Sequence, residues 1–338
     1  MIGDLMQQAN QLRNLTFLQA ITEALGHEME RDKSIVIMGE DVRTWGGVFG
    51  RFKGFRERFG DERVLDTPIS EAGFVGAGVG AAATGLRPVV DLMFVDFFGV
   101  TGDQIFNQAA KMKYMFGGKA KIPLTIITLI GGGVSAAAQH SECLYSIFAH
   151  IPGLKCVVPS TPYDAKGLLT TALRQDDPVM FFEHKFLHNT VEGPVPSESY
   201  AIPFGSADIK REGSDVTIVA LAKTVHQSLE AAGVLEKEGI SVEVVDLRTI
   251  VPLDEQTVLN SVKKTGKLIV VDEDYPRCGM ATDISALVAG KGWHYLDAPI
   301  AMVTSLDTPP PFSPVLEEAF LPSVARITEA ARAAVGRN

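Results

Sequence analysis

The chain has 338 residues, 46% of them hydrophobic and 21% charged, and 41 Asp and Glu outnumber 31 Lys and Arg to give a formal net charge of -10. This acid surplus argues against nucleic acid, because phosphate binding needs clustered Lys and Arg, and no basic run exceeds two residues. The length predicts two domains, each large enough to bury its own core.

The sequence contains three cysteines, Cys143, Cys156 and Cys278. Their spacing fits neither a secreted disulfide framework nor a metal site, and Cys156 lies in an apolar run where a small core residue is expected. The first 14 residues lack the zones of a signal peptide. The uncharged stretch between Lys121 and Glu142 is interrupted by glycines and polar residues, so we do not expect it to span a membrane. Together these features favour a reducing cytoplasm.

The first half of the chain alternates between two periodicities. Helical spacing is found over residues 18–29, 71–84, 103–114 and 163–174, and apolar strands are expected over 34–38, 88–95, 124–130, 154–158 and 179–183. Continuous apolar strands that alternate with helices predict a parallel sheet covered on both faces.

Between residues 188 and 206 the periodicity stops, and prolines and polar residues predict a linker. A second alternation follows, with strands expected over 216–221, 242–246, 268–271 and 300–303 and helices over 224–237, 254–262 and 280–288. We therefore predict two α/β domains, residues 1–190 and 206–338, joined by a linker over 191–205.

A group of glycines in the predicted helix 71–84 has two interpretations. Gly78 and Gly80, with Asp96 downstream, faintly resemble a dinucleotide fingerprint, which would make the chain an NAD-dependent dehydrogenase. They lie inside a helix rather than in the turn after a strand, so close helix packing is the simpler interpretation. A non-catalytic scaffold is the third class considered.

Two residues stand where an α/β enzyme would carry its chemistry. Glu71 opens the small-residue helix after a short strand, although a carboxylate there can also serve only the helix dipole. His140 follows Gly131-Gly-Gly133 on a loop after a buried strand. No two histidines have the spacing of zinc ligands, so no metal ligands are predicted.

A set of short motifs carries a more specific signal: Gly39-Glu-Asp-Val42, Asp66-Thr-Pro-Ile-Ser-Glu71, Phe94-Val-Asp-Phe97, Asp103-Gln-Ile-Phe-Asn107, Gln139-His-Ser141, His150-Ile-Pro-Gly-Leu154 and Asp164-Ala-Lys-Gly167. Together they closely resemble the beta subunit of the thiamine-diphosphate-dependent first component of 2-oxo acid dehydrogenase complexes, over nearly the whole chain. Within that family, Tyr114-Met-Phe-Gly-Gly-Lys119 and Phe181-Phe-Glu-His-Lys185 look most like acetoin dehydrogenase beta subunits. Pyruvate dehydrogenase comes next, and enzymes of branched 2-oxo acids follow.

The resemblance implies a transketolase-like α/β fold, with a parallel-sheet pyrimidine-binding domain and a transketolase C-terminal-like domain. It implies that Glu71 binds the aminopyrimidine nitrogen of thiamine diphosphate and that Phe97 packs on the pyrimidine ring. His140 corresponds to the histidine that faces the substrate during cleavage and during acyl transfer to lipoamide.

The resemblance also implies partners. Enzymes of this kind hold the diphosphate through Mg²⁺ on a Gly-Asp-Gly motif, and this chain has only Gly60-Asp-Glu62, so the ligands are expected on an alpha subunit. The expected assembly is an α2β2 heterotetramer that docks a lipoyl-bearing acyltransferase core, with Asp283 as an acidic contact. A K⁺ site is a further family feature that the sequence does not locate.

The chain departs from the family at three positions. Ile127 and Ile130 replace an Arg and an aromatic that the family often carries, and Glu142 stands where Gln is common. These positions adjoin the expected substrate end, so they bear on substrate identity more than on the cofactor.

Overall fold

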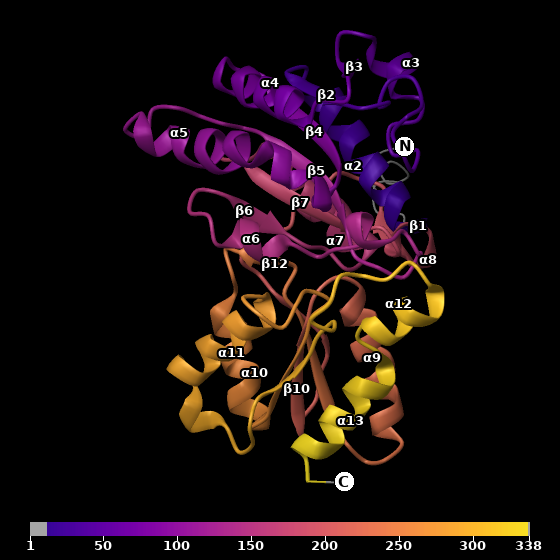
Figure 1. Cartoon of the computed structure of the whole chain (residues 1–338), viewed down its shortest axis with the longest axis vertical. Coiled ribbons are helices and arrows are strands. Elements are labelled where there is room, and N and C mark those ends of the chain that lie inside the picture. Colours follow the sequence, from indigo (N-terminus) through magenta and orange to yellow (C-terminus); the bar gives the residue numbers. More distant parts are fainter. Residues whose placement is uncertain (1–11, 337–338) are drawn as a thin grey trace, which may run out of the picture. The chain divides into compact units, whose positions relative to one another are not determined.

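The computed structural model describes residues 12–336. Residues 1–11, which make up most of the segment without a signal-peptide pattern, lie outside the described residues, as do the last two. The described chain forms two compact units (Figure 1): residues 12–129 with Ile147–Phe204, and Ile130–Ser146 with residues 205–336. Within the described residues, no helix is both long and apolar enough to cross a membrane.

The first unit alternates strands and helices along the chain. Its strands are β1 (Leu12–Thr16), β2 (Ile35–Gly39), β3 (Val64–Asp66), β4 (Arg87–Phe94), β5 (Thr125–Ile130), β6 (Lys155–Val157), β7 (Val179–His184) and β8 (Glu192–Pro196). Its helices are α2 (Phe17–Arg31), α3 (Phe55–Phe59), α4 (Glu71–Ala83), η1 (Val95–Thr101), η2 (Asp103–Ala109), α5 (Ala110–Met115), α6 (Tyr145–Ala149), α7 (Pro162–Arg174) and α8 (Leu187–Thr190).

The main sheet of the first unit has the strand order β6-β7-β5-β4-β2-β3. β2 pairs in parallel with β3 and with β4, and β4 pairs in parallel with β5. Every residue of β2, β5 and β7 is buried, as expected for strands covered on both faces. The predicted parallel α/β architecture is confirmed.

Helix α4 approaches the sheet unusually closely. A Cβ atom on Gly78 would lie 2.6 Å from Cγ2 of Val90 in β4, so a side chain at this position would force the helix away. Gly80 faces open space. Gly78 therefore serves helix packing, as predicted, and does not form a phosphate-binding turn.

Two local features differ from the sequence prediction. The expected helix over 103–114 is divided into the π-helix η2 and the α-helix α5. Within the expected linker, β8 pairs antiparallel with β1 in a two-stranded sheet. Pro194 and Pro196 fit there because a two-stranded ribbon leaves an edge at which no N–H group is needed.

A buried ionic network fixes the loop between β2 and α3. Arg51 donates to Asp91 Oδ1 at 3.1 Å and to Glu183 Oε2 at 2.7 Å, and His188 Nε2 lies 2.9 Å from the same Glu183 oxygen. Burial alone would raise the pKa of Glu183, but Arg51 and His188 outweigh it and hold the pKa below its usual value. Asp91 and Glu183 lie 40 and 132 positions from Arg51, so no local pattern could have revealed the network.

The second unit is a smaller α/β structure. Its elements are η3 (Ala138–His140), β9 (Asp208–Arg211), β10 (Val216–Ala220), α9 (Lys223–Glu236), β11 (Val242–Asp246), β12 (Thr249–Val251), α10 (Glu255–Thr265), β13 (Leu268–Val271), α11 (Met280–Lys291), η4 (Trp293–Tyr295), β14 (Ala301–Val303), α12 (Pro314–Phe320) and α13 (Val324–Ala334). Its sheet has the order β14-β13-β10-β11-β9, in which only β9 pairs antiparallel. Helices α9 and α13 cover one face and α10 and α11 the other (Figure 1).

Candidate active site

Glu71 begins α4, and the strands before it set its place. β2 and β3 run in parallel, and the loop after β2 is tied to the end of β3 because Asp66 Oδ1 accepts the N–H of Arg43 at 2.6 Å. Thr67 N donates to Gly39 O at 3.0 Å, which joins the carboxyl ends of the two strands. The half-buried carboxylate of Glu71 therefore stands at the edge of a parallel sheet where α/β proteins bind ligands.

A second acid lies close to Glu71. Glu40 directly follows β2, is buried, and has one carboxylate oxygen, Oε1, without a hydrogen-bond partner among the described residues. Burial, followed by the negative charge of Glu71, raises the pKa of Glu40. Sequence reasoning did not single out Glu40, although its place directly after a buried strand was a usable signal.

Phe97 lies in η1, which follows β4. Its half-buried ring packs edge-on against Phe94, with ring centroids 5.6 Å apart and an interplanar angle of 68°. Helix α4, which carries Glu71, packs against η1. The first unit thus brings together the elements that carry the carboxylate and the aromatic ring predicted to bind the cofactor.

His140 is carried by the second unit. It ends η3, is half-buried, and its backbone N–H donates to Ala137 O at 3.3 Å. Gly131 N donates to Glu142 O at 3.0 Å, and this bond closes the segment between the two residues, which contains His140, into a loop. The two departures in β5, Ile127 and Ile130, are buried at 0% and 1% exposure, so they are core positions.

Three acids after β13 anchor the segment that carries His140. Tyr145 donates its hydroxyl to Asp272, and Ser146 Oγ donates to Asp274 Oδ2 at 2.5 Å. Glu273 Oε1 accepts the N–H of Gly132 at 2.6 Å. These bonds tie residues 130–146 to the second compact unit, whereas the predicted first domain runs on to residue 190.

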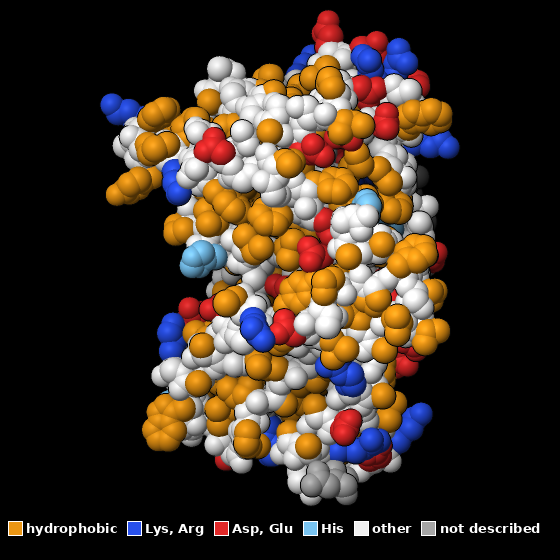
Figure 2. All heavy atoms as spheres, in the orientation of Figure 1, with side chains coloured by type: hydrophobic (Ala, Val, Ile, Leu, Met, Phe, Trp, Pro, Cys, Tyr) orange, Lys and Arg blue, Asp and Glu red, His pale blue; other side chains and the backbone are white. Residues whose placement is uncertain are grey.

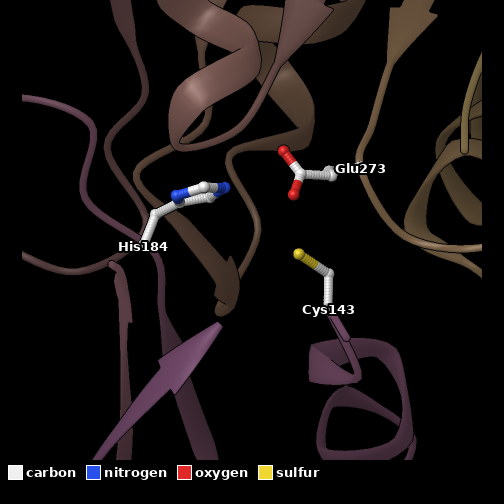
Figure 3. A group of neighbouring side chains, drawn as sticks. All are labelled: Cys143, His184 and Glu273. Atoms are coloured by element: carbon white, nitrogen blue, oxygen red, sulfur yellow. The ribbon is translucent and has the colours of Figure 1, made fainter. Parts of the chain in front are cut away.

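Glu273 also neighbours a cysteine of the same unit. Figure 3 shows the Cys143 sulfur directed toward the Glu273 carboxylate, with atoms of the two side chains within 4.8 Å of one another. The third residue drawn, His184, ends β7 in the first unit. Both Cys143 and Glu273 are buried, so the acid after β13 meets this segment in the protein interior.

We expect Asp274→Asn to change how stability depends on pH. Burial, followed by the charge of Asp272, raises the pKa of Asp274 to about 8. In the unfolded chain the pKa of an Asp is about 3.9. Between about pH 4 and about pH 8 the folded state binds more protons than the unfolded state, so the free energy of unfolding falls as pH rises, by at most about 1.4 kcal/mol per pH unit. Asn does not titrate, so the variant does not show this fall in stability.

The melting temperature of the variant minus that of the wild type should therefore rise steadily from about pH 5 to about pH 8 and then level off. Thermal unfolding of both proteins in the same assembly and buffers measures it. A difference that is constant over this range would contradict the assignment.

Both halves of the chain are similar to known domain families. Residues 13–190 match the transketolase pyrimidine-binding domain family, and residues 205–327 match the transketolase C-terminal domain family. A solved structure described as a split-gene transketolase, an inactive beta4 tetramer, superposes with a TM-score of 0.79 at 22% identity, over 95% of this chain and 99% of the other. Fold and domains together define a transketolase-type protein.

Several relatives that are similar in sequence are beta subunits of oxidoreductases, which is a narrower class than transketolase-type proteins. The chain is 56% identical to the acetoin:2,6-dichlorophenolindophenol oxidoreductase subunit beta of Cupriavidus necator, over 95% of this chain and 97% of the relative. It is 53% identical to the subunit of that name in Bacillus subtilis, over 93% of this chain and 95% of the relative. It is 44% identical to the pyruvate dehydrogenase E1 component subunit beta of B. subtilis, over 95% of this chain and 98% of the relative.

The chain belongs to the family of beta subunits of thiamine-diphosphate-dependent acetoin and 2-oxo acid dehydrogenases. This confirms the family resemblance and the transketolase-like fold predicted from the motifs. The roles of Glu71, Phe97 and His140 stay predictions.

Proposed function

We propose that this chain is the beta subunit of an acetoin dehydrogenase that cleaves acetoin and passes the two-carbon unit to lipoamide. The observation that carries the proposal is the difference in identity among relatives of nearly equal coverage. Identity is 56% and 53% to the two acetoin oxidoreductase subunits, against 44% and 43% to the pyruvate and 2-oxoisovalerate dehydrogenase subunits of B. subtilis. Oxidative decarboxylation of pyruvate is the second candidate, which the 44% relative supports.

The residues of the first unit fit thiamine diphosphate. A half-buried carboxylate, Glu71, stands at the start of α4, a half-buried ring, Phe97, lies on the adjoining η1, and Glu40 keeps a buried oxygen without a partner among the described residues. An aminopyrimidine needs these groups, since it presents ring nitrogens for hydrogen bonding and a flat face for packing. When bound, the cofactor supplies a nucleophilic carbon and an electron sink.

Each residue has a separate task in this proposal. Glu71 holds a proton at the pyrimidine ring nitrogen, and Phe97 packs on the ring and keeps water from it. His140 gives or takes a proton at a substrate oxygen and serves the later transfer to lipoamide.

The alpha subunit is proposed to supply the Mg²⁺ ligands and to complete an α2β2 heterotetramer, because the relatives are named subunits beta. The face of α4 formed by Gly73, Ala77 and Gly80 is exposed and lacks bulky side chains, so a helix of a partner can approach it closely. Figure 2 shows further hydrophobic side chains at the end of α5, where Tyr114 is 88% and Phe116 57% exposed.

Further partners stay at the level of proposals. Asp283 is exposed in the first turn of α11, where it is available to a lipoyl-bearing acyltransferase core. A K⁺ ion is proposed without a location. Cys143, Cys156 and Cys278, all among the described residues, form no disulfide there, and a reducing cytoplasm is the proposed compartment.

The substrate is tested by reconstituting the chain with its alpha subunit and following reduction of 2,6-dichlorophenolindophenol. We expect kcat/KM for acetoin to exceed the values for pyruvate and for a branched 2-oxo acid by about tenfold or more, which is about 1.4 kcal/mol of discrimination. A preference for pyruvate would replace the first candidate with the second. Dye reduction that requires NAD instead of thiamine diphosphate would favour the dehydrogenase alternative.

A further inference from the structure

The loop before His140 has an unusual backbone. Gly131 and Gly133 have φ angles of +87° and +97°, and Ser135 and Ala137 have φ angles of +54° and +66°. Glycine adopts this left-handed region readily, whereas Ser and Ala rarely do. Two non-glycine residues in this conformation within three positions require other contacts that hold them there.

A carboxylate from α12 makes those contacts. Glu317 Oε1 accepts the N–H of Gly133 at 2.9 Å, and Oε2 accepts the N–H of Ser135 at 2.9 Å and its hydroxyl at 3.3 Å. Glu317 is 3% exposed, so these donors take the place of water around its carboxylate. Backbone N–H groups in alternating turn conformations form a concave anion site, and here the anion is a side chain of the same unit.

The start of the loop is tightly packed as well. Gly132 donates to Glu273 at 2.6 Å, and a Cβ atom on Gly132 would lie 3.1 Å from Leu321 and 3.2 Å from Glu317 Oε1. The far end continues directly into η3, where His140 N donates to Ala137 O. The loop is therefore clamped from Gly132 to Ser135, and the clamp lies five residues before His140.

We propose that Glu317 is a positioning residue: its carboxylate fixes the loop 131–137 and thereby sets the orientation of the His140 ring. The inference rests on the proposed role of His140 in turnover. A residue that acts through the placement of another changes the rate of the chemical step, because a shift of about 1 Å in a reacting group can cost about a hundredfold. It leaves activation of the cofactor, which the proposal assigns to Glu71, unchanged.

The test is Glu317→Gln in the complex reconstituted with the alpha subunit. The amide has nearly the same size, but it lacks the charge and places an NH₂ group against backbone N–H donors. We expect kcat to fall by about ten- to a hundredfold with KM changed by less than about threefold. Hydrogen exchange of a peptide spanning 130–142 should become faster, and proton exchange at the thiazolium carbon should stay at the wild-type rate.

Glu318→Gln is the matched control, because it makes the same chemical change on the exposed side of the same helix and should behave as wild type. Faster hydrogen exchange in 130–142 with an unchanged kcat would overturn the proposal, and so would unchanged hydrogen exchange. If Glu317→Gln does not assemble, Ser135→Ala removes only the hydroxyl contact. It should lower kcat by about two- to fivefold, and a wild-type kcat would then overturn the proposal.

His140→Ala separates this inference from the proposed function. If His140→Ala keeps full turnover, the role of His140 fails whatever Glu317→Gln does. If His140→Ala loses turnover and Glu317→Gln does not, the proposed function stands and the positioning role of Glu317 is rejected.

Discussion

Glu71→Gln is expected to slow proton exchange at the thiazolium carbon of bound thiamine diphosphate by about a hundredfold or more. Glutamine is almost the same size as glutamate, but it can neither bear a negative charge nor hold an acidic proton at the pyrimidine nitrogen. Glu71 opens α4, which packs on β4, and is half-buried, so we expect the amide variant to preserve the helix and this packing. Assembly with the alpha subunit should therefore be retained while turnover is lost.

Exchange is measured by mixing the reconstituted complex with D₂O, quenching in acid and recording proton NMR of the released cofactor. Glu57→Gln, on the exposed surface of α3, is the control and should exchange like wild type. His140→Ala should also keep wild-type exchange and lose turnover of acetoin, which separates the two catalytic roles. Wild-type exchange in Glu71→Gln, with the cofactor bound, would refute the assignment of Glu71.

Much of the fold could be predicted because its signals are local. The capping box at Thr16, in which Thr16 Oγ1 accepts the N–H of Gln19 at 3.2 Å and the Gln19 side chain accepts the N–H of Thr16 at 2.9 Å, marks the start of α2. Continuous apolar runs predicted β5 and β7 as strands buried on both faces. The family motifs then named Glu71 and Phe97, whose elements prove to be in contact.

The features that were missed depend on contacts between distant positions. The bonds from Gly133 and Ser135 to Glu317 span 184 and 182 positions, so periodicity cannot reveal that an acid on α12 holds the loop before His140. The bonds that tie residues 130–146 to acids after β13 likewise join residues 127 and 128 positions apart. β8 was not predicted, because a proline-rich segment indicates a linker unless it is known to pair with another strand at the edge of a sheet; here that strand is β1.

The isolated chain is expected to be inactive, with turnover at least about a thousandfold below that of the complex with the alpha subunit. Removal of one positioned donor in an active site costs about a hundred- to a thousandfold, and a site without its Mg²⁺ ligands lacks several. The sequence has Gly60-Asp-Glu62 but no Gly-Asp-Gly. The exposed face of α4 and the exposed Tyr114 at the end of α5 are surfaces that the alpha subunit can cover.

Titration of the chain with its alpha subunit measures this dependence. Acetoin turnover should rise with added alpha subunit and level off at equimolar amounts, and light scattering at that point should give the mass of an α2β2 heterotetramer. Gly80→Trp tests the surface: its Cβ would meet no atom within 4 Å in this chain, so the variant should fold, yet a large side chain there should block close approach of a partner helix. Gly233→Trp is the matched control, because Gly233 lies inside α9 of the second unit and a Cβ atom there would also meet no atom within 4 Å; it should associate like wild type. Turnover of acetoin by the chain alone would show that the proposal of a shared site is wrong. Unchanged association of Gly80→Trp with the alpha subunit would show that the proposed α4 surface is wrong.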